Sequence, residues 1–461
     1  MKRLFFLATV FTGFAASAQP GTPNNNAIQN EGRAPYRTEF VSYDIRKEAE
    51  LGDPYGSKYY RPLTFKLNTA ARFILFEATS DLPLLWLDRD VYLRDAGRTG
   101  RYRLLVNGRE AGLNTDTYGT NDFYISPYLK DGINKFSLEF TPDIPGGDME
   151  EWTIDEKRLI IENLFIWSQP RIHIFDYIAA GYPNPDGPDA IFALDIVLVN
   201  SFNTDETVTV GYDIYDPVGN LKEYTFNEVT IPGHGCDTVS FRNKIFGTEK
   251  YQYTADKPEL YKVMLSLKHQ GRNTEYIPFR LGFGTTRFDG ENVQRNGRTL
   301  YISAVEQDAP NQRNTLRRLR LMKRRGINTL YVTRPQQQWF YDMCEENGIY
   351  IIDRAAVDCD PRDDNRGLGG TVANDPAYLD RFIDRQQNIY HRNKNRANVI
   401  GWSIGSDSGN GYNMYKSYQW LKEADPDRVV VYQFARGEWN TDIEVPEPQP
   451  LEQILEGMTS R

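Results

Sequence analysis

The stretch Asn398–Asn413 reads Asn-Val-Ile-Gly-Trp-Ser-Ile-Gly-Ser-Asp-Ser-Gly-Asn-Gly-Tyr-Asn, an apolar run that gives way to small and polar residues. The apolar part, Val399–Ile404, is typical of a parallel strand that is buried on both faces. A strand of this kind delivers side chains to a site at its C-terminal end. The carboxylate delivered here is Asp407, so the stretch predicts a parallel α/β unit with Asp407 at a strand end.

Strands and helices alternate on both sides of this stretch. Five strands are expected at 299–305, 329–332, 349–353, 399–403 and 428–433, with helices at 314–325, 337–346, 378–392 and 414–423. This alternation predicts consecutive βα units and a parallel sheet.

A different pattern precedes residue 290. From about residue 59, short alternating runs are separated by Gly, Asn and Asp, and Asn107-Gly108 is a strong signal for a type I′ hairpin turn. The runs from about residue 59 to residue 176 together predict an antiparallel sandwich. About seven further short strands, over roughly a hundred residues, fit an immunoglobulin-like sandwich.

The N-terminus has the pattern of a secretory signal peptide. Lys2 and Arg3 precede the apolar run Leu4–Ala16, and Ala16-Ser17-Ala18 offers a cleavage site. A buried N-terminal core segment is the alternative. No second long apolar stretch follows, so we expect no membrane span and a secreted protein, in the periplasm or cell envelope of a bacterium. Residues 19–45 are expected to form a flexible lead-in, because their first half is rich in Pro, Asn and Gly.

Composition narrows the class of protein. Three cysteines, Cys236, Cys344 and Cys359, do not make a disulfide framework in a chain of 461 residues. The formal net charge of −9 disfavours nucleic acid or an anionic membrane as a partner. Aromatic residues make up 13% of the chain, a share that suits sugar stacking and β-sandwich cores alike.

Several motifs together resemble those of family 2 glycoside hydrolases, the β-galactosidase and β-glucuronidase group. Trp402-Ser-Ile-Gly-Ser-Asp-Ser resembles that family's acid/base strand, Trp-Ser-Leu-Gly-Asn-Glu-Ser. The run from Asp122 to Asn134 resembles the motif of its sugar-binding jelly roll, and Tyr253–Val263 resembles its join into the barrel.

The resemblance covers nearly the whole mature chain and implies its organisation. Residues 1–18 would be the signal peptide and 19–45 the flexible segment. A jelly-roll domain (46–178), an immunoglobulin-like β-sandwich (179–290) and a partial TIM barrel (291–461) would follow. Five strands cannot close an eight-stranded barrel, so we expect a partner chain or a second copy to cover its open edges.

The family's catalytic residues carry over in part. A retaining glycosidase uses two carboxyl groups about 5 Å apart, one as acid and one as nucleophile. Asp407 stands at the acid/base position, where the family has Glu. The strand that carries the family's nucleophile would lie beyond residue 461. The resemblance implies carbohydrate as the ligand, with Trp402, Arg334 and Asn413 as candidate substrate-binding residues.

A cation site is a further candidate. Some β-galactosidases bind Mg²⁺ at positions that match Asp358, Asp360 and Asp407, and three carboxylates suit Mg²⁺ or Ca²⁺. The alternative is that these carboxylates are solvated or paired with nearby arginines, which are Arg334, Arg354 and Arg362. No other cofactor is expected.

Three interpretations of the chain stay open. It could be a catalytically impaired descendant of the family that binds carbohydrate or serves as an envelope assembly module. It could be an active β-galactosidase-like retaining glycosidase that acts on O-glycosyl bonds. It could also be a fragment of such an enzyme.

Overall fold

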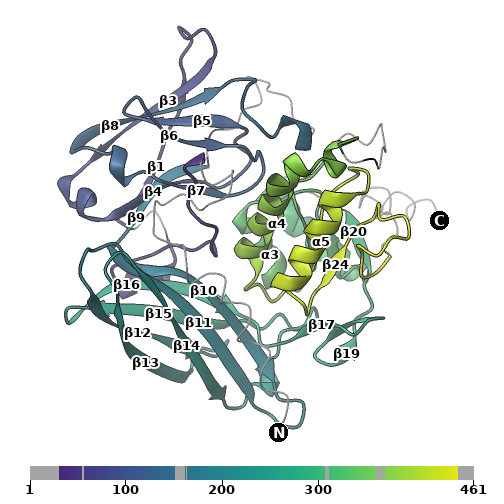
Figure 1. Ribbon diagram of the computed structural model, residues 1–461. Helices are drawn as coiled ribbons and strands as arrows, with labels where there is room; N and C mark the ends of the chain where they lie inside the picture. Colours follow the sequence, from purple (N-terminus) through teal and green to yellow (C-terminus); the bar gives the residue numbers. More distant parts are fainter. Residues whose placement is uncertain are drawn as a thin grey trace.

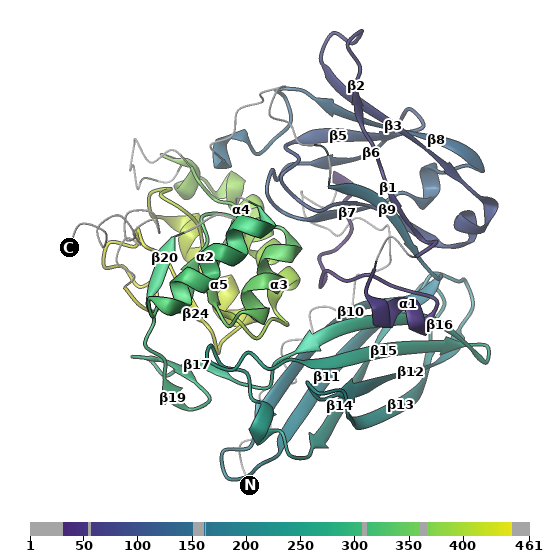
Figure 2. The ribbon, with the colours of Figure 1, turned by 180° about the vertical axis from the view of Figure 1, so that it is seen from behind.

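The computed structural model describes residues 31–53, 57–150, 161, 163–306, 311–359, 367 and 369–444. Figure 1 shows two β-rich units, coloured purple to blue and teal, and an α/β unit, coloured green to yellow, that packs against both. An N-terminal segment, residues 31–53, runs between the units. It includes the short helix α1 (Arg46–Leu51), which lies beside the second β unit in Figure 2.

Two antiparallel sheets enclose the core of the first unit, in the strand orders β1-β9-β4-β7 and β2-β3-β8-β5-β6. The core side chains come from both sheets, and Val91, Leu104 and Phe136 among them are fully buried. The hairpin predicted at Asn107-Gly108 is confirmed, because both residues have positive φ and join β5 directly to β6. The strands are β1 (Tyr60–Pro62), β2 (Lys66–Leu67), β3 (Ile74–Leu82), β4 (Asp90–Asp95), β5 (Tyr102–Val106), β6 (Arg109–Asn114), β7 (Asn121–Tyr124), β8 (Gly132–Phe140) and β9 (Leu164–Gln169).

The second unit is also a pair of antiparallel sheets, β10-β11-β14 and β13-β12-β15-β16. Alternate residues of its long strands, such as Leu194, Ile196 and Leu198, enter a shared core. Its first strand runs across the expected domain boundary at residues 178–179, because the whole of β10 pairs with β11. The strands are β10 (Ile172–Pro183), β11 (Ala190–Asn200), β12 (Glu206–Tyr215), β13 (Leu221–Ile231), β14 (Cys236–Ile245), β15 (Tyr261–His269) and β16 (Arg272–Leu281).

Both β units thus agree with the expected β-rich organisation, while the finer names jelly roll and immunoglobulin-like stay predictions. A small antiparallel sheet of β17 (Thr286–Phe288), β18 (Val293–Arg295) and β19 (Arg298–Thr299) connects the second unit to the α/β unit.

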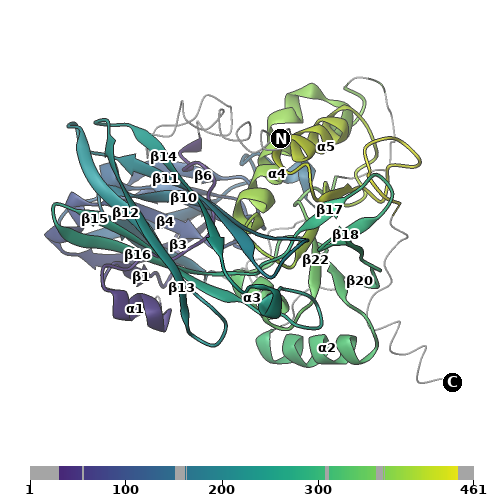
Figure 3. The same cartoon turned by 90° about the horizontal axis from the view of Figure 1, so that it is seen from below.

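The α/β unit contains the parallel sheet that the alternation of strands and helices predicts. Its five strands lie in chain order, β20 (Ala304–Glu306), β21 (Thr329–Tyr331), β22 (Tyr350–Arg354), β23 (Val399–Ser403) and β24 (Val429–Val431), and every neighbouring pair is parallel. The helices are α2 (Gln312–Arg324), α3 (Gln338–Glu346), α4 (Leu379–Asn393) and α5 (Tyr412–Ala424). Each element overlaps its predicted range. Figure 3 shows α2 and α5 on opposite sides of this unit.

Local sequence explains where these helices begin and what they bury. The side chain of Asn311 caps α2 by accepting a hydrogen bond from the Asn314 backbone N–H. Leu319 and Met322, one turn apart, are buried against the sheet, as their spacing predicts. None of the helices in the described ranges is long and apolar enough to cross a membrane.

Residues 31–45, which were expected to be flexible, are held by buried ion pairs. The Arg33 guanidinium lies 3.1 Å from the Asp384 carboxylate on α4, and the Arg37 guanidinium lies 3.1 Å from Asp122 on β7. Both arginines are less than one tenth exposed. The composition of the segment did not reveal these contacts because their acidic partners lie far along the chain.

Candidate functional site

The C-terminal ends of the parallel strands bring a cluster of polar side chains together. The buried Arg354, at the end of β22, places Nη2 3.2 Å from Oε1 of Glu306 at the end of β20. The same nitrogen donates to Oε1 of Gln433, beyond β24, at 3.4 Å. The Arg354 guanidinium also lies 4.4 Å from the centre of the Tyr331 ring. One arginine therefore ties together three strands of the sheet at the end where a site is expected.

Strand β23 contributes to the same cluster through Ser403. Its hydroxyl accepts a hydrogen bond from the Tyr331 hydroxyl at 2.7 Å and donates to the Gly405 carbonyl at 3.3 Å. The chain then turns sharply at Gly405, and the Ser406 N–H donates to the Val357 carbonyl at 2.7 Å. This turn positions Asp407 two residues after Gly405 and four residues beyond the end of β23.

Asp407 is half-buried, and its Oδ1 is a buried atom that has no hydrogen-bond partner among the described residues. The Tyr432 side chain is close enough for the charge of Asp407 to affect the pKa of its hydroxyl. Burial raises the pKa of the Tyr432 hydroxyl, and the negative charge of Asp407 adds to the effect. The side chains of Asp407 and Tyr432 therefore lie close to one another beyond the strand ends.

Arg334, a predicted substrate-binding residue, lies half-buried beyond the end of β21. Its Nη1 donates to the hydroxyl of Tyr118 at 2.8 Å. Tyr118 belongs to the loop between β6 and β7, so the first β unit reaches the strand ends of the α/β unit. No local sequence signal indicates this contact, because the two residues are 216 positions apart.

Trp402 and Asn413 have buried positions. Side chains alternate between the two faces of a strand, so Ser403 meets Tyr331 whereas Trp402 packs against Tyr390 of α4. Trp402 has no exposed surface, and its Nε1 donates to Asp425 at 2.9 Å. Asn413 is also fully buried, and its Nδ2 donates to the carbonyls of residues 372 and 375 at 2.9 and 2.8 Å. Both side chains serve packing and loop anchoring here, and a role in substrate binding stays a prediction.

The structure describes two of the three residues of the predicted cation site, Asp358 and Asp407. Asp358 is exposed at the end of a segment that follows β22, and Asp360 lies outside the described residues. In the part of the chain that the structure describes, no three His, Cys, Asp or Glu side chains are arranged to hold a metal ion. The unpartnered Oδ1 of Asp407 fits a role as one oxygen ligand. The site stays a prediction, which a Ca²⁺ or Mg²⁺ titration of thermal stability, compared with Asp358→Asn, would test.

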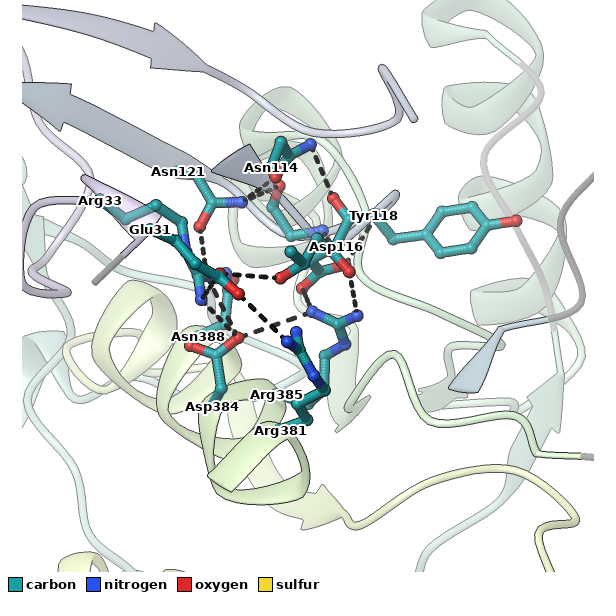
Figure 4. Close-up of polar contacts among 12 residues, drawn as sticks. Glu31, Arg33, Asn114, Asp116, Tyr118, Asn121, Arg381, Asp384, Arg385 and Asn388 are labelled. Atoms are coloured by element: carbon teal, nitrogen blue, oxygen red, sulfur yellow. Dashed lines mark hydrogen bonds and ion pairs between the residues drawn. The ribbon is translucent and has the colours of Figure 1, made fainter. Parts of the chain in front are cut away.

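A second polar cluster, which sequence reasoning missed, joins the first β unit to α4 (Figure 4). We call it the junction network, and it consists of Glu31, Arg33, Asp116, Glu150, Asp384 and Arg385. Arg385 Nη2 lies 2.7 Å from Glu150 and donates to the Thr115 carbonyl at 2.6 Å, while its Nη1 lies 3.2 Å from Asp116. Burial raises the pKa of the Glu150 carboxyl, against the opposing effect of Arg385.

The junction network holds loops of the first β unit against the α/β unit. Met149, next to Glu150, is fully buried in the core of the α/β unit. The Met149 carbonyl accepts the Asp358 N–H at 2.8 Å. The first residues of the acidic stretch that begins at Asp148 are therefore anchored next to the strand ends. The rest of this stretch, residues 151–160, lies outside the described ranges.

Comparison with known proteins agrees with this geometry. Residues 290–446 match the family model described as "Glycosyl hydrolases family 2, TIM barrel domain". The chain is 25% identical over 411 residues to a β-galactosidase of Priestia megaterium and 24% identical over 359 residues to one of Streptococcus thermophilus. These alignments cover 85% and 75% of this chain, and the chain spans 38% and 34% of the two relatives' lengths.

Solved structures show the same fold. A β-glucuronidase of Bacteroides uniformis superposes with a TM-score of 0.65 at 18% identity, over 87% of this chain and 52% of that one. A protein described as a putative β-galactosidase of Bacteroides fragilis gives a TM-score of 0.65 at 16% identity, over 84% of this chain and 58% of that one. The arrangement of two β-rich units followed by a parallel α/β unit is thus shared with known structures.

Proposed function

We propose that this chain, which resembles family 2 glycoside hydrolases in sequence and fold, is a secreted carbohydrate-binding protein with impaired hydrolytic activity. The signal-peptide pattern of residues 1–18, which lie outside the described ranges, supports a location in the periplasm or cell envelope. The family resemblance supports a β-linked glycan or glycoside as the ligand. Assembly with a partner chain or a second copy, across the outer strands β20 and β24, belongs to the same proposal, and light scattering of the purified protein tests it.

The ion pair between Arg354 and Glu306 is the observation that carries the proposal. A retaining glycosidase needs two carboxyl groups that face the scissile bond. One carboxylate at the strand ends, that of Glu306, forms an ion pair with the buried guanidinium of Arg354, which lies 3.2 Å away. This pairing favours a structural role for Glu306 over a role in attack on a sugar.

The shorter side chain at position 407 supports the same conclusion. Asp407 stands where the resemblance places a glutamate, so its carboxyl group is withdrawn by one methylene. Misplacement of a catalytic group by about 1 Å can cost about 10²-fold in rate. Binding of sugar, which depends on many contacts, is less sensitive to this change.

An active retaining β-glycosidase of the β-galactosidase type is the second candidate. It is favoured by Asp407, which keeps a carboxyl group at the position where the resemblance places the acid/base residue. The similarity to two β-galactosidases favours it as well.

Two measurements on the purified mature protein separate these candidates. On a glycan array we expect saturable binding, and with nitrophenyl β-galactoside and β-glucuronide we expect no turnover above background. Turnover that disappears in Asp407→Ala, but persists in the exposed-loop control Asp131→Ala, would overturn the proposal in favour of the active enzyme. Absence of both binding and turnover would contradict both candidates.

A further inference from the structure

Helix α2 has an unusual composition for an acidic protein. Its 13 residues include six basic side chains and no acidic one, whereas the whole chain has a formal net charge of −9. The helix lies on the near side of the α/β unit in Figure 2 and at the rim of that unit in Figure 3. Positive charge is therefore concentrated on one outer element of the molecule.

Four of these side chains form a single row, which we call the arginine stripe and which consists of Arg313, Arg317, Arg320 and Arg324. Their spacing of four, three and four residues places them within a sector of about 60° around the helix, and the row is about 16 Å long. All four residues are exposed. The opposite side of the helix carries Thr315, Leu319 and Met322, which are fully buried. The arginine stripe thus points directly into solvent.

The arginine stripe has no acidic partner among the described residues. The Nε of Arg324 donates to the Arg320 carbonyl at 3.3 Å, but no carboxylate in the described ranges forms an ion pair with any of the four guanidinium groups. Other arginines at the surface differ, because Arg46, Arg103 and Arg280 each pair with at least two carboxylates. The unpaired state is therefore a property of α2 and not of surface arginines in general.

The row of like charges is unfavourable for the helix itself. Side chains three and four residues apart are neighbours on a helix, so equal charges at this spacing repel each other. Arg313, in the first turn, also lies at the positive end of the helix dipole, whereas Lys323 and Arg324, in the last turn, lie at the favourable end. The fold of α2 alone gives the first three arginines of the stripe no stabilising role, and a bound polyanion would remove their repulsion.

Further cations extend this surface beyond the C-terminal end of α2. Lys323 and the exposed Arg298, on β19, line a hollow of about 340 Å³ together with the buried Arg295. Lys323 donates to the Ala255 carbonyl at 2.9 Å, and Arg298 forms no ion pair with a described residue. Of the described residues that line the hollow, Asp256 alone is acidic. The positive surface thus continues from α2 to the small sheet that precedes it.

The chemistry of the arginine stripe favours a narrow, linear polyanion. A guanidinium binds a carboxylate through two parallel N–H groups, a geometry that lysine lacks, and all four residues of the stripe are arginine. A DNA duplex carries charge over a wide surface and would meet the negative remainder of the protein. Single-stranded nucleic acid is disfavoured because the stripe contains no aromatic side chain on which bases could stack. A lipid surface is disfavoured because the apolar side of α2 is buried in the protein core and cannot enter a bilayer.

We propose that the arginine stripe binds a linear acidic polysaccharide, whose regularly repeated carboxylates pair with successive guanidinium groups. Stiff sugar rings hold these carboxylates in a row, so less conformational freedom is lost on binding than with an acidic peptide. The stripe faces away from the parallel sheet and shares no residue with the strand-end cluster. This proposal therefore goes beyond the ligand proposed for that cluster and does not depend on it.

Isothermal titration calorimetry of the mature protein with oligogalacturonate, which bears one carboxylate per sugar, tests the proposal. We expect saturable binding with a Kd of about 1 mM or tighter, which weakens as salt screens the exposed charges. The fully methyl-esterified oligomer keeps the sugar chain but lacks the charge, so we expect it not to bind. The lack of saturable binding by the charged oligomer, or equal binding by its methyl ester, would overturn the proposal.

Variants locate the binding surface. Arg317→Gln/Arg320→Gln removes the two central guanidinium groups and should weaken binding by about fivefold or more. Arg317→Lys/Arg320→Lys keeps the charge but loses the paired N–H groups, so it should cause a smaller but measurable loss. The control Lys66→Gln/Arg72→Gln removes two exposed cations from the first β unit and should change the affinity less than about twofold. Equal losses in the glutamine variant and the control would contradict the proposal, and so would wild-type binding by the lysine variant.

Thermal unfolding separates a lost binding surface from a lost fold. Arg317→Gln/Arg320→Gln relieves repulsion along α2, so its Tm should equal or exceed that of the wild type. A clearly lower Tm would assign these arginines a structural role and contradict the proposal.

Competing polyanions test the choice of partner. Polyglutamate, phosphatidylglycerol vesicles and duplex DNA, compared at equal concentrations of charge, should each bind more weakly than oligogalacturonate. Tighter binding by any of the three would overturn the assignment of a polysaccharide to the arginine stripe.

Discussion

At the scale of single residues, Asp353 shows how burial determines the chemistry of a carboxyl group in this protein. The residue is fully buried on β22 and accepts hydrogen bonds of 2.7 Å from the Tyr341 hydroxyl and from Nδ2 of Asn393. Burial raises the pKa of Asp353 to about 6, although both hydrogen bonds and the nearby Arg392 act in the opposite direction. The folded protein therefore binds this proton more tightly than the unfolded chain does.

This shift predicts how stability depends on pH. A raised carboxyl pKa stabilises the folded state below the unfolded pKa of about 4, and the benefit is lost as pH rises to about 6. The loss attributable to Asp353 should be about 3 kcal/mol. Urea unfolding at pH 4 and pH 7 measures it, with Asp353→Asn as the reference that lacks the titrating group. A difference between wild type and variant that is the same at both pH values would contradict the prediction.

At the scale of elements, the turn that ends β23 sets the position of Asp407. A Cβ atom on Gly405 would lie 2.9 Å from both the Cβ and the carbonyl oxygen of Val357, closer than packed atoms allow. Gly405→Ala should therefore separate β23 from the segment after β22 and displace Asp407.

The control Gly297→Ala isolates this crowding. Gly297 has a positive φ of 74° but no atom within 4 Å of an added Cβ, so alanine there causes backbone strain alone, about 1–2 kcal/mol. We expect Gly405→Ala to lower the free energy of unfolding further than this control, as measured by urea unfolding. Equal losses in the two variants would show that crowding against Val357 has no effect.

Elements were the part of this structure that the sequence predicted best. Each βα unit has a strand of apolar residues and a helix with one apolar face, and both patterns are local in the chain. Contacts of the candidate site were harder to predict, since Arg354 pairs with a residue 48 positions earlier and Arg334 with one 216 positions earlier. The sequence indicated Asp407 as a strand-end carboxylate, and in the structure it lies four residues beyond the end of β23, while its role in a site stays a prediction. The apolar run Val399–Ile404 indicated that Trp402 would be buried. The sequence did not indicate the burial of Asn413, because its hydrogen bonds to two loop carbonyls have no periodic pattern.

At the scale of the whole molecule, the junction network joins units that are far apart in sequence. Arg385 is 1% exposed and lies between Asp116 and Glu150 of the first β unit. Replacing one partner of a buried ion pair leaves uncompensated charge and costs about 3–5 kcal/mol. Arg385→Met should therefore destabilise the protein by about this amount, measured by chemical unfolding.

A more exposed ion pair serves as the control, because it shows how much stability is lost when an arginine charge is removed without burial. Arg103 on β5 is 28% exposed and lies 3.1 Å from Glu110, so Arg103→Met should cost about 1 kcal/mol or less. If the two variants lose the same stability, the junction network does not hold the units together.

The contact between Arg33 and Asp384 has a consequence for synthesis. The two residues are 351 positions apart, so a ribosome has made nearly the whole described chain before Arg33 can meet its partner. At a translation rate of about 5–20 residues per second, this delay is about 20–70 seconds. During that interval the β units can fold, while the segment that begins at Glu31 waits for α4. Its docking therefore follows the synthesis of α4 and comes later than the folding of the two β units.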